Sequence, residues 1–258
     1  MKLVTGYLAT LDVLGFAELL YREGYSQQLK AYLDTIDQIV RPASVDAECV
    51  LFSDSIVLTS AGDDDKAFRG LVKASAAAFH ALIMDELPVR GALAFGRFWR
   101  HASGGSVFLA GRPIVEAYRR ERAQKWVGIT LCPSILHEQS SLRVLTQFPS
   151  EGPVGTRKLD LALRLQPASV PFQDAGSSGI RDLSGYAVVP LDTDDDLESA
   201  ARTLKRMHRS LETLRLKAPD PPAQAKYEAT LKWLEEVQLR VEKAVKDLRG
   251  RSGRPTTR

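Results

Sequence analysis

Residues 51–58 read Leu-Phe-Ser-Asp-Ser-Ile-Val-Leu, an apolar and β-branched run that is interrupted by one acid, Asp54. Residues 7–16 read Tyr-Leu-Ala-Thr-Leu-Asp-Val-Leu-Gly-Phe and also carry a single acid, Asp12, near their C-terminal end. Runs of this length and composition, bounded by Gly or Asp clusters, predict strands of a sheet that is covered on at least one face. We therefore expect the two stretches to lie in the core of the fold.

The two acids are unusual for such strands. An unpaired buried charge is costly, so Asp12 and Asp54 are expected to face a cation or hydrogen-bond donors. On neighbouring strands they would form a site for a hard divalent ion such as Mg²⁺, which takes oxygen ligands and often only one or two protein carboxylates plus substrate phosphates. The alternative is that each acid lies at a strand end, caps the next turn and binds nothing.

The composition is that of an ordinary globular protein. The chain has 258 residues, of which 44% are hydrophobic and 26% charged, enough for one large domain or a domain with an appendage. The net charge of +3 comes partly from a basic tail, so it gives little support for nucleic-acid binding. No apolar run approaches membrane-spanning length, and the first residues lack the basic region, apolar stretch and cleavage site expected of a signal peptide. Cys49 and Cys132 lie in apolar segments, which favours buried free thiols and a soluble, cytoplasmic protein.

Strands and helices alternate along most of the chain, which predicts an α/β fold. The expected elements are a first strand that ends near residue 14, a helical segment over 15–40 with a break at Gly24, a strand over 48–59, a helix over 66–87, a strand over 89–96, a turn or exposed hairpin over 97–105, an extended piece over 106–110, a helix over 114–124, a strand over 126–131, a short helix over 132–139, a strand over 143–148, a loop-like stretch over 152–185 with one candidate strand over 158–165, and a closing strand over 186–191.

The character of the sequence changes at about residue 194, where only helical periodicity remains. Two apolar stripes are separated by the proline-rich segment 218–222; they comprise Leu197, Ala200, Ala201, Leu204, Met207, Leu211 and Leu214, and then Leu231, Leu234, Val237, Val241, Val245 and Leu248. This pattern predicts a helical hairpin that packs on the core or on a partner. The expected organisation is a domain over 1–192, a hairpin over 193–248 and a basic, disordered tail over 249–258.

Four short motifs occur in a suggestive order. An aspartate precedes a Gly-Phe turn in Leu11–Phe16, a second aspartate lies in Phe52–Ser55, Arg90-Gly91-Ala92 is followed by Gly96, and a helix opens at Gly111 and reads Gly-x-x-Ile-Val-x-Ala-Tyr-Arg up to Arg119. This order resembles the catalytic domain of class III nucleotidyl cyclases over roughly residues 5–135. The forms Asp-x-Leu-Gly-Phe, Phe-Ser-Asp-Ser and Arg-Gly-Ala are similar to the pyrimidine cyclases of bacterial Pycsar antiphage defence, which make cyclic UMP or cyclic CMP.

The resemblance implies roles for particular residues. The metal ligands would be Asp12, Val13 and Asp54, which hold two Mg²⁺ or Mn²⁺ ions; the nucleotide contacts would be Val13, Leu14, Gly15, Phe16, Val50, Phe108 and Lys125; the catalytic residue would be Arg119, facing charge that develops at the α-phosphate. Gly15 permits unusual backbone angles, so the turn around it could cradle the triphosphate. Arg119 could instead be a solvated member of the charged run 119–122, and Lys125 a plain surface lysine.

The sequence also departs from the purine-specific cyclases. Val115 stands four residues before Arg119, where those enzymes have an Asn, while Val50 and Phe108 stand at about the places of the base-selecting Lys and Asp. A site that reads a purine by hydrogen bonds needs those partners, so a standard adenylate or guanylate cyclase is disfavoured. An inactive cyclase fold fits the same departures equally well. The presence of both aspartates favours the active interpretation.

The resemblance implies an assembly as well. Class III sites lie between two catalytic domains, so a chain with one such domain is expected to form a head-to-tail homodimer with two equivalent sites. The predicted activity is that of a pyrimidine nucleotidyl cyclase, with UTP preferred over CTP and 3′,5′-cyclic UMP as a second messenger for a separate effector in antiphage defence. No membrane or nucleic-acid partner is expected. The alternatives are a non-catalytic nucleotide-sensing or dimerising module and a purine cyclase with an unusual base pocket.

Overall fold

A single mixed sheet with helices on both faces organises the molecule. The structure is a computed structural model, and it describes residues 2–40, 47–60, 62–103, 106–138, 165–173, 180–191 and 197–252. Its elements are β1 (Lys2–Val13), α1 (Phe16–Leu20), α2 (Tyr25–Val40), β2 (Ala47–Phe52), β3 (Ser55–Ser60), α3 (Asp65–Met84), β4 (Val89–Ser103), β5 (Ser106–Gly111), α4 (Arg112–Ala123), β6 (Gly128–Leu131), α5 (Pro133–Leu136), β7 (Leu165–Phe172), β8 (Arg181–Val188), α8 (Leu197–Lys217) and α9 (Pro221–Ser252). The predicted α/β class is confirmed.

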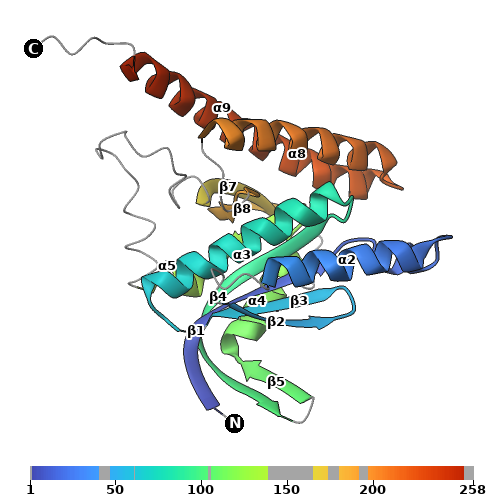
Figure 1. The fold of residues 1–258 in the computed structure, drawn as a ribbon, viewed down its shortest axis with the longest axis vertical. Helices are drawn as coiled ribbons and strands as arrows, with labels where there is room; N and C mark the ends of the chain where they lie inside the picture. Colours follow the sequence, from blue (N-terminus) through green and yellow to red (C-terminus); the bar gives the residue numbers. More distant parts are fainter. Residues whose placement is uncertain are drawn as a thin grey trace, which may run out of the picture.

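Strand β1 is an interior strand of the sheet, between β3 and β4. The strand order is β2-β3-β1-β4-β6-β8-β7, and β5 pairs with β4 to form a hairpin (Figure 1). Strand β1 is antiparallel to both β3 and β4, whereas β4 and β6 are parallel. The register pairs Asp12 with Ser55 on one side and with Arg90 on the other. This pairing places the acid of the first strand beside both the second acidic motif and the Arg-Gly motif.

Alternation along β1 divides the core in two. Tyr7, Ala9 and Leu11 face the main core under α2, α3 and the C-terminal helices, while Leu8 faces a smaller core that includes Ala117 of α4. The close approach of β1 and β4 needs a glycine, because a Cβ at position 91 would lie 2.6 Å from the Thr10 carbonyl oxygen. The small residues of the Arg-Gly-Ala motif thus bring the side chain of Arg90 against β1.

Three expected elements differ from the structure. The strand predicted over 48–59 is wrong, because the chain reverses at Ser53-Asp54 and forms the β2–β3 hairpin. The strand expected over 89–96 continues to Ser103 and pairs with β5, so the described residues 97–103 of the expected turn or hairpin are a strand of a hairpin. The stretch expected to be loop-like contains β7, which forms an edge of the sheet in place of the last strand. The strand predicted over 143–148 and nearly all of the candidate over 158–165 lie outside the described residues.

The C-terminal hairpin packs on its own chain. Helices α8 and α9 lie side by side beyond α3 (Figure 1) and bury the predicted stripes, including Leu204, Met207, Leu211, Leu234 and Val237. The indole nitrogen of Trp233 donates to the Pro167 carbonyl at 3.1 Å, and its ring meets Trp126 edge-on at 5.3 Å. Helix α9 extends to Ser252, which takes it into the segment expected to be a tail. Residues 253–258 lie outside the described part of the chain.

Helix α3 is the core helix of the molecule. Within the described residues it is the one helix with the length and composition to cross a membrane, and 61% of that window is buried inside the protein. The core helix of a soluble protein passes the same test, so this is weak evidence for a membrane span. Its contacts with the sheet and with α8 explain why it is so apolar.

Candidate functional site

The two acidic motifs meet at one end of the sheet. Strand β1 ends just after Asp12, and the Val13 amide donates to the Asp54 carbonyl at 3.0 Å. The hydroxyl of buried Tyr32 donates to the Ser53 carbonyl at 3.4 Å, which fixes the same turn from the α2 side. Burial raises the pKa of Tyr32, and the negative charges of Cys49, Asp54 and Asp12 in their ionised forms raise it further. Tyr32 therefore acts as a neutral donor that supports the turn.

The turn itself has an unusual conformation. Ser53 has a φ of +57°, and it is the first of two residues in the hairpin connection. Of the two residues in this connection, Ser53 has a positive φ and Asp54 does not. This is the pattern of a type II′ turn, in which Gly is preferred at the first position. Left-handed conformations of other residues cost free energy and persist where the surroundings enforce them. Here the bonds to Tyr32 and Val13 hold the turn that carries Asp54.

Arg90 is the immediate partner of Asp12. Its Nε donates to Oδ2 of Asp12 at 3.1 Å, and an Nη nitrogen lies 3.0 Å from the same oxygen; both side chains are 19% exposed. Burial raises the pKa of Asp12, the Arg90 charge opposes this, and the negative charge of Asp54 raises the pKa further. The charge of Asp54 therefore lies close enough to Asp12 to disfavour the ionised form of that carboxyl, and the charge of Arg90 favours it.

Glu121 is a third acid of this cluster, and it was not among the site residues expected from the sequence. It lies on α4 with 4% of its surface exposed, and its Oε1 is 3.6 Å from Nε of Arg90. Burial raises the pKa of Glu121 to about 7, and the Asp12 charge adds to this effect while Arg90 opposes it. Glu121 follows the buried residues Pro113 and Ala117 at intervals of four, so helical periodicity was the signal available in the sequence.

The Gly15 turn joins the acidic end of the sheet to α1. Gly15 has a φ of +76°, and the Leu14 amide donates to the Pro88 carbonyl at 2.7 Å. Phe16 is buried, with its ring 5.5 Å from that of Tyr32. The Phe16 side chain packs in the core, so this residue could meet a ligand only through its backbone. Leu14 and Gly15 line a cleft of about 670 Å³, whose opposite wall is the tip of the C-terminal hairpin.

The remaining predicted residues lie apart from this cluster. Arg119 and Val115 are exposed on one face of α4, four residues apart. Phe108 is 55% exposed on β5 and stacks on His101. No contact within the described residues joins Arg119 or Phe108 to Asp12.

Two more predicted residues, Val50 and Lys125, lie on elements that border the acidic end of the sheet. Val50 lies half-buried on β2, in the hairpin whose turn carries Asp54, and an ion pair between Glu48 and Arg100 links β2 to β4. Lys125 follows α4, where its amide donates to the Pro171 carbonyl at 2.8 Å. One chain therefore holds the acidic half of the predicted site, while Arg119 and Phe108 face outward.

The donor set at the acidic end suits Mg²⁺ or Mn²⁺. Asp12 and Asp54 supply carboxylate oxygens, and Mg²⁺ is commonly bound by one or two carboxylates plus substrate phosphates. Across the described residues, no group of three or more His, Cys, Asp or Glu side chains is placed to hold a metal ion.

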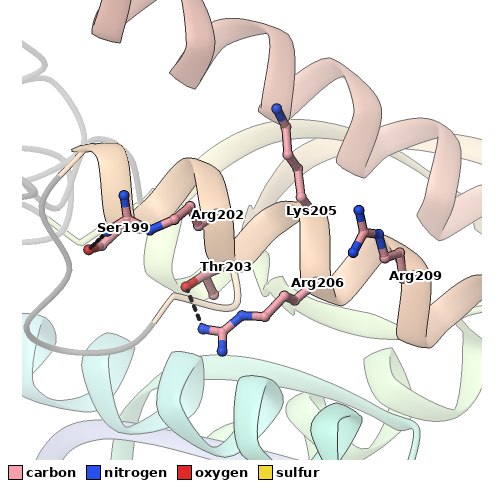
Figure 2. Close-up of a pocket in the computed structure, with 6 residues that line it drawn as sticks. All are labelled: Ser199, Arg202, Thr203, Lys205, Arg206 and Arg209. Carbon is pink, nitrogen blue, oxygen red and sulfur yellow. Dashed lines mark hydrogen bonds between the residues drawn. The ribbon is translucent and has the colours of Figure 1, made fainter.

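A second hollow lies along α8. Figure 2 shows an open groove along α8 that is lined by Ser199, Arg202, Thr203, Lys205, Arg206 and Arg209. Arg202 donates to Ser199 at 2.7 Å, Arg206 to Thr203 at 3.4 Å, and Lys205 pairs with Glu242 at 3.0 Å. None of the predicted site residues is among the described residues that line this groove, so the acidic end of the sheet stays the candidate site.

Comparison with known proteins bears on the fold. No family model matches the sequence, and no curated protein matches it. Among solved structures, the adenylyl cyclase CyaB from P. aeruginosa superimposes with a TM-score of 0.51 at 15% sequence identity, covering 75% of this chain and 99% of that chain. The fold is that of class III nucleotidyl cyclases.

Two more distant matches carry similar descriptions. One is the guanylyl cyclase domain of the RhoGC fusion protein from the aquatic fungus Blastocladiella emersonii, at 16% identity, 73% and 98% coverage and a TM-score of 0.47. The other is a bacterial light-regulated adenylyl cyclase, at 13% identity, 80% and 100% coverage and a TM-score of 0.46. The assignment of the class III cyclase fold rests on CyaB, and it confirms the fold expected from the motifs.

Proposed function

We propose that the protein is a nucleotidyl cyclase, which converts a nucleoside triphosphate into a 3′,5′-cyclic nucleotide and pyrophosphate. The observation that carries the proposal is the junction of two acidic turns in a class III cyclase fold, with Val13 bonded to the Asp54 carbonyl and Arg90 beside Asp12. A structural role alone leaves the proximity of two carboxylates at this end of the sheet unexplained, because like charges at close range raise the cost of folding.

In this reaction the 3′-hydroxyl of the nucleotide attacks the α-phosphorus and pyrophosphate leaves. Two Mg²⁺ or Mn²⁺ ions held by Asp12, Asp54 and the Val13 carbonyl would lower the pKa of the 3′-hydroxyl and neutralise phosphate charge. The chain itself positions the reactants. The backbone around Gly15 would face the triphosphate, and Arg90 and Lys125 would add positive charge on the same side.

Arg119 would act from the second copy of the chain. It is exposed and lies outside the Asp12 cluster of its own chain, so a head-to-tail homodimer is the arrangement that brings it to the α-phosphate. Its planar, permanently charged guanidinium suits charge that develops in the transition state. Exposed apolar side chains lie on the same α4 face and on the β4–β5 hairpin, namely Val115, Tyr118, Trp99, Val107 and Phe108. Burial of these side chains would stabilise such a dimer.

We further propose that the base is a pyrimidine, with UTP preferred over CTP. The support is the apolar character of Val50 and Phe108, at about the places where purine-specific cyclases have polar base contacts. Cyclic UMP would then serve a separate effector in antiphage defence, and the protein would work in the cytoplasm. CTP as the preferred substrate is the alternative within the same chemistry.

The proposal is tested by supplying Mn²⁺ and each of ATP, GTP, CTP and UTP separately and identifying products by mass spectrometry. Cyclic UMP or cyclic CMP is expected from the wild type and from Asp34→Asn, whose carboxylate forms an exposed ion pair with Lys30. No cyclic product is expected from Asp54→Asn, in which one charge is lost at nearly constant volume. Cyclic AMP or GMP alone would overturn the pyrimidine assignment, and equal activity of Asp54→Asn would overturn the metal site.

A non-catalytic nucleotide-binding module is the second candidate, because exposed Val115 stands where purine cyclases have an Asn. It predicts metal-dependent nucleotide binding without any turnover. Measured binding that needs Asp54, together with no product from any nucleotide in a confirmed dimer, would favour it over the enzyme.

A further inference from the structure

The tip of the C-terminal hairpin lies over the candidate nucleotide site. The cleft of about 670 Å³ has Leu14 and Gly15 on one wall and Lys226 and Tyr227 of α9 on the other. Near the end of α3, the Lys217 ammonium at the end of α8 pairs with Glu86 at 2.7 Å. The hairpin tip therefore encloses one side of the turn that is proposed to meet the triphosphate.

A buried hydrogen-bond pair fixes α9 against the sheet. The hydroxyl of Thr230 accepts from the Val127 amide at 3.0 Å and donates to the Val127 carbonyl at 2.8 Å. Thr230 is fully buried. Val127 directly precedes β6, whose first residue pairs with Arg90, and Arg90 pairs with Asp12. Lys226 lies one helical turn before this anchor, so its place relative to the acidic end is set by backbone contacts.

Lys226 is a half-buried cation that senses the charges of two others, Arg90 and Lys125. Burial lowers the pKa of Lys226, and the positive charges of Arg90 and Lys125 lower it further, while Asp220 and Asp12 oppose this. Among the described residues, no carboxylate lies within ion-pair distance of the Lys226 ammonium, in contrast to Lys217. A half-buried ammonium that has no acid partner among the described residues and lines the cleft beside Gly15 is in an environment that an anionic ligand would stabilise.

We propose that Lys226 binds the terminal phosphates of the nucleoside triphosphate, so that the C-terminal hairpin is part of the substrate site of its own chain. This inference rests on the proposed function, since it assigns a further residue to the same site. The ammonium of Lys is a compact charge on a flexible stem, which suits a polyphosphate chain whose exact position varies. The hairpin would thus link nucleotide binding to the helices that cover the sheet.

The experiment uses the full chain and inorganic triphosphate with Mg²⁺ as the probe, with binding measured by calorimetry. Lys226→Gln is expected to weaken binding about tenfold, equivalent to about 1.4 kcal/mol, while Lys226→Arg keeps most of the affinity. Two controls, Lys217→Gln in the same cleft and exposed Lys232→Gln on α9, are expected to stay within about twofold of the wild type. Binding of a nucleoside monophosphate is expected to be the same in Lys226→Gln and in the wild type, because it lacks the terminal phosphates.

The readouts separate this inference from the proposed cyclase activity. A tenfold loss of triphosphate binding in Lys226→Gln alone supports the role of Lys226 even in a protein that forms no cyclic product. In an active enzyme the same variant is expected to raise KM for the triphosphate more than it lowers kcat. Unchanged triphosphate binding in Lys226→Gln, or an equal loss in Lys217→Gln, overturns the inference and leaves the cyclase proposal standing. Thermal unfolding of each variant confirms that the fold is intact.

Discussion

Helix α4 carries charged residues in two opposite environments. Its inner end, at Glu121, is buried, and its outer face, at Arg119 and Val115, is exposed. At the inner end, Glu121 is buried beside Arg90, which also pairs with Asp12. On the outer face, Arg119 and Val115 are exposed. Helix α4 therefore carries Glu121, which belongs to a cluster within the chain, and Arg119, which has no partner among the described residues.

This difference suggests that the chain builds one half of a catalytic site and presents the other half to a second copy. Buried charges need partners that offset their desolvation, and Arg90 offsets part of it for two acids. An exposed arginine costs little to keep and is available to a partner surface. The comparison predicts that substitutions at the inner end change stability and activity together, whereas those on the outer face change activity alone.

The largest expected effect is loss and recovery of activity in mixed dimers. Asp54→Asn and Arg119→Ala are each expected to reduce cyclase activity by at least about a hundredfold, since one removes a metal ligand and the other a transition-state charge. If the two groups act in one site from different chains, a mixture of the two variants contains dimers with one intact site. Random exchange then restores about a quarter of wild-type activity. The activity of purified mixtures, followed over hours of subunit exchange, measures this.

The same mixture can also contradict the proposal that Asp54 and Arg119 of one site come from different chains. No recovery, although mass photometry or tagged pull-down shows that the variants have exchanged subunits, would mean that Asp54 and Arg119 must lie in the same chain. A mixture of Asp54→Asn with Asp12→Asn is the matched control, because both substitutions damage the same half and no intact site can form.

A smaller effect is expected on the stability of the chain itself. Arg90→Met removes the cation that contacts both Asp12 and Glu121, and leaving a buried acid without its partner costs about 3 kcal/mol or more. Arg119→Met removes an exposed charge and is expected to change the free energy of unfolding by less than about 0.5 kcal/mol. Urea unfolding at neutral pH, in buffer free of divalent ions, compares the two. Equal effects of both substitutions would show that the inner cluster is not a stabilising unit.

Much of the fold was predictable because its signals are local. Apolar runs marked β1, β3 and β6, and alanine-rich periodicity marked α3. The turn at Ser53-Asp54 escaped because its sequence lacks the Asn-Gly or Gly-first signal of a two-residue hairpin, and backbone contacts from Val13 and Tyr32 hold it instead. Strand β7 carries Pro167 and Pro171, which argue against a central strand but are tolerated at the edge of a sheet.

Only those site residues that lie in a recognisable sequence motif were predictable. Asp12 and Asp54 interrupt apolar runs, so each stands out, and the structure brings their turns together; their roles as metal ligands stay a prediction. Glu121 sits in a charged run that looks solvated, although its spacing from Ala117 places it on the buried face. Lys226 lies more than two hundred residues from Asp12, and no local pattern signals that α9 returns to the acidic end. Such proximity arises from tertiary packing alone.

The smallest expected effect is a pH dependence that belongs to Glu121. Its pKa is raised to about 7 in the folded chain, against an ordinary value near 4.5. The folded state therefore keeps its proton at pH values where the unfolded state has lost it, so the free energy of unfolding falls as pH rises between about 4.5 and 7. Glu121→Gln is expected to remove this slope and to be more stable than the wild type at pH 8, by about 1–2 kcal/mol. Urea unfolding from pH 5 to pH 8, without divalent ions, measures the difference.

The control for this dependence is Glu23→Gln, which alters an exposed acid and is expected to follow the wild type at every pH. The raised pKa of Asp12 gives a slope of the same sign in wild type and variants, so the comparison between Glu121→Gln and wild type isolates the α4 acid. Parallel curves for the two would mean that Glu121 is ionised in the folded chain throughout this range. Arg90 would then be neutralising two charged acids at once, and the inner end of α4 would be less sensitive to protons than its burial implies.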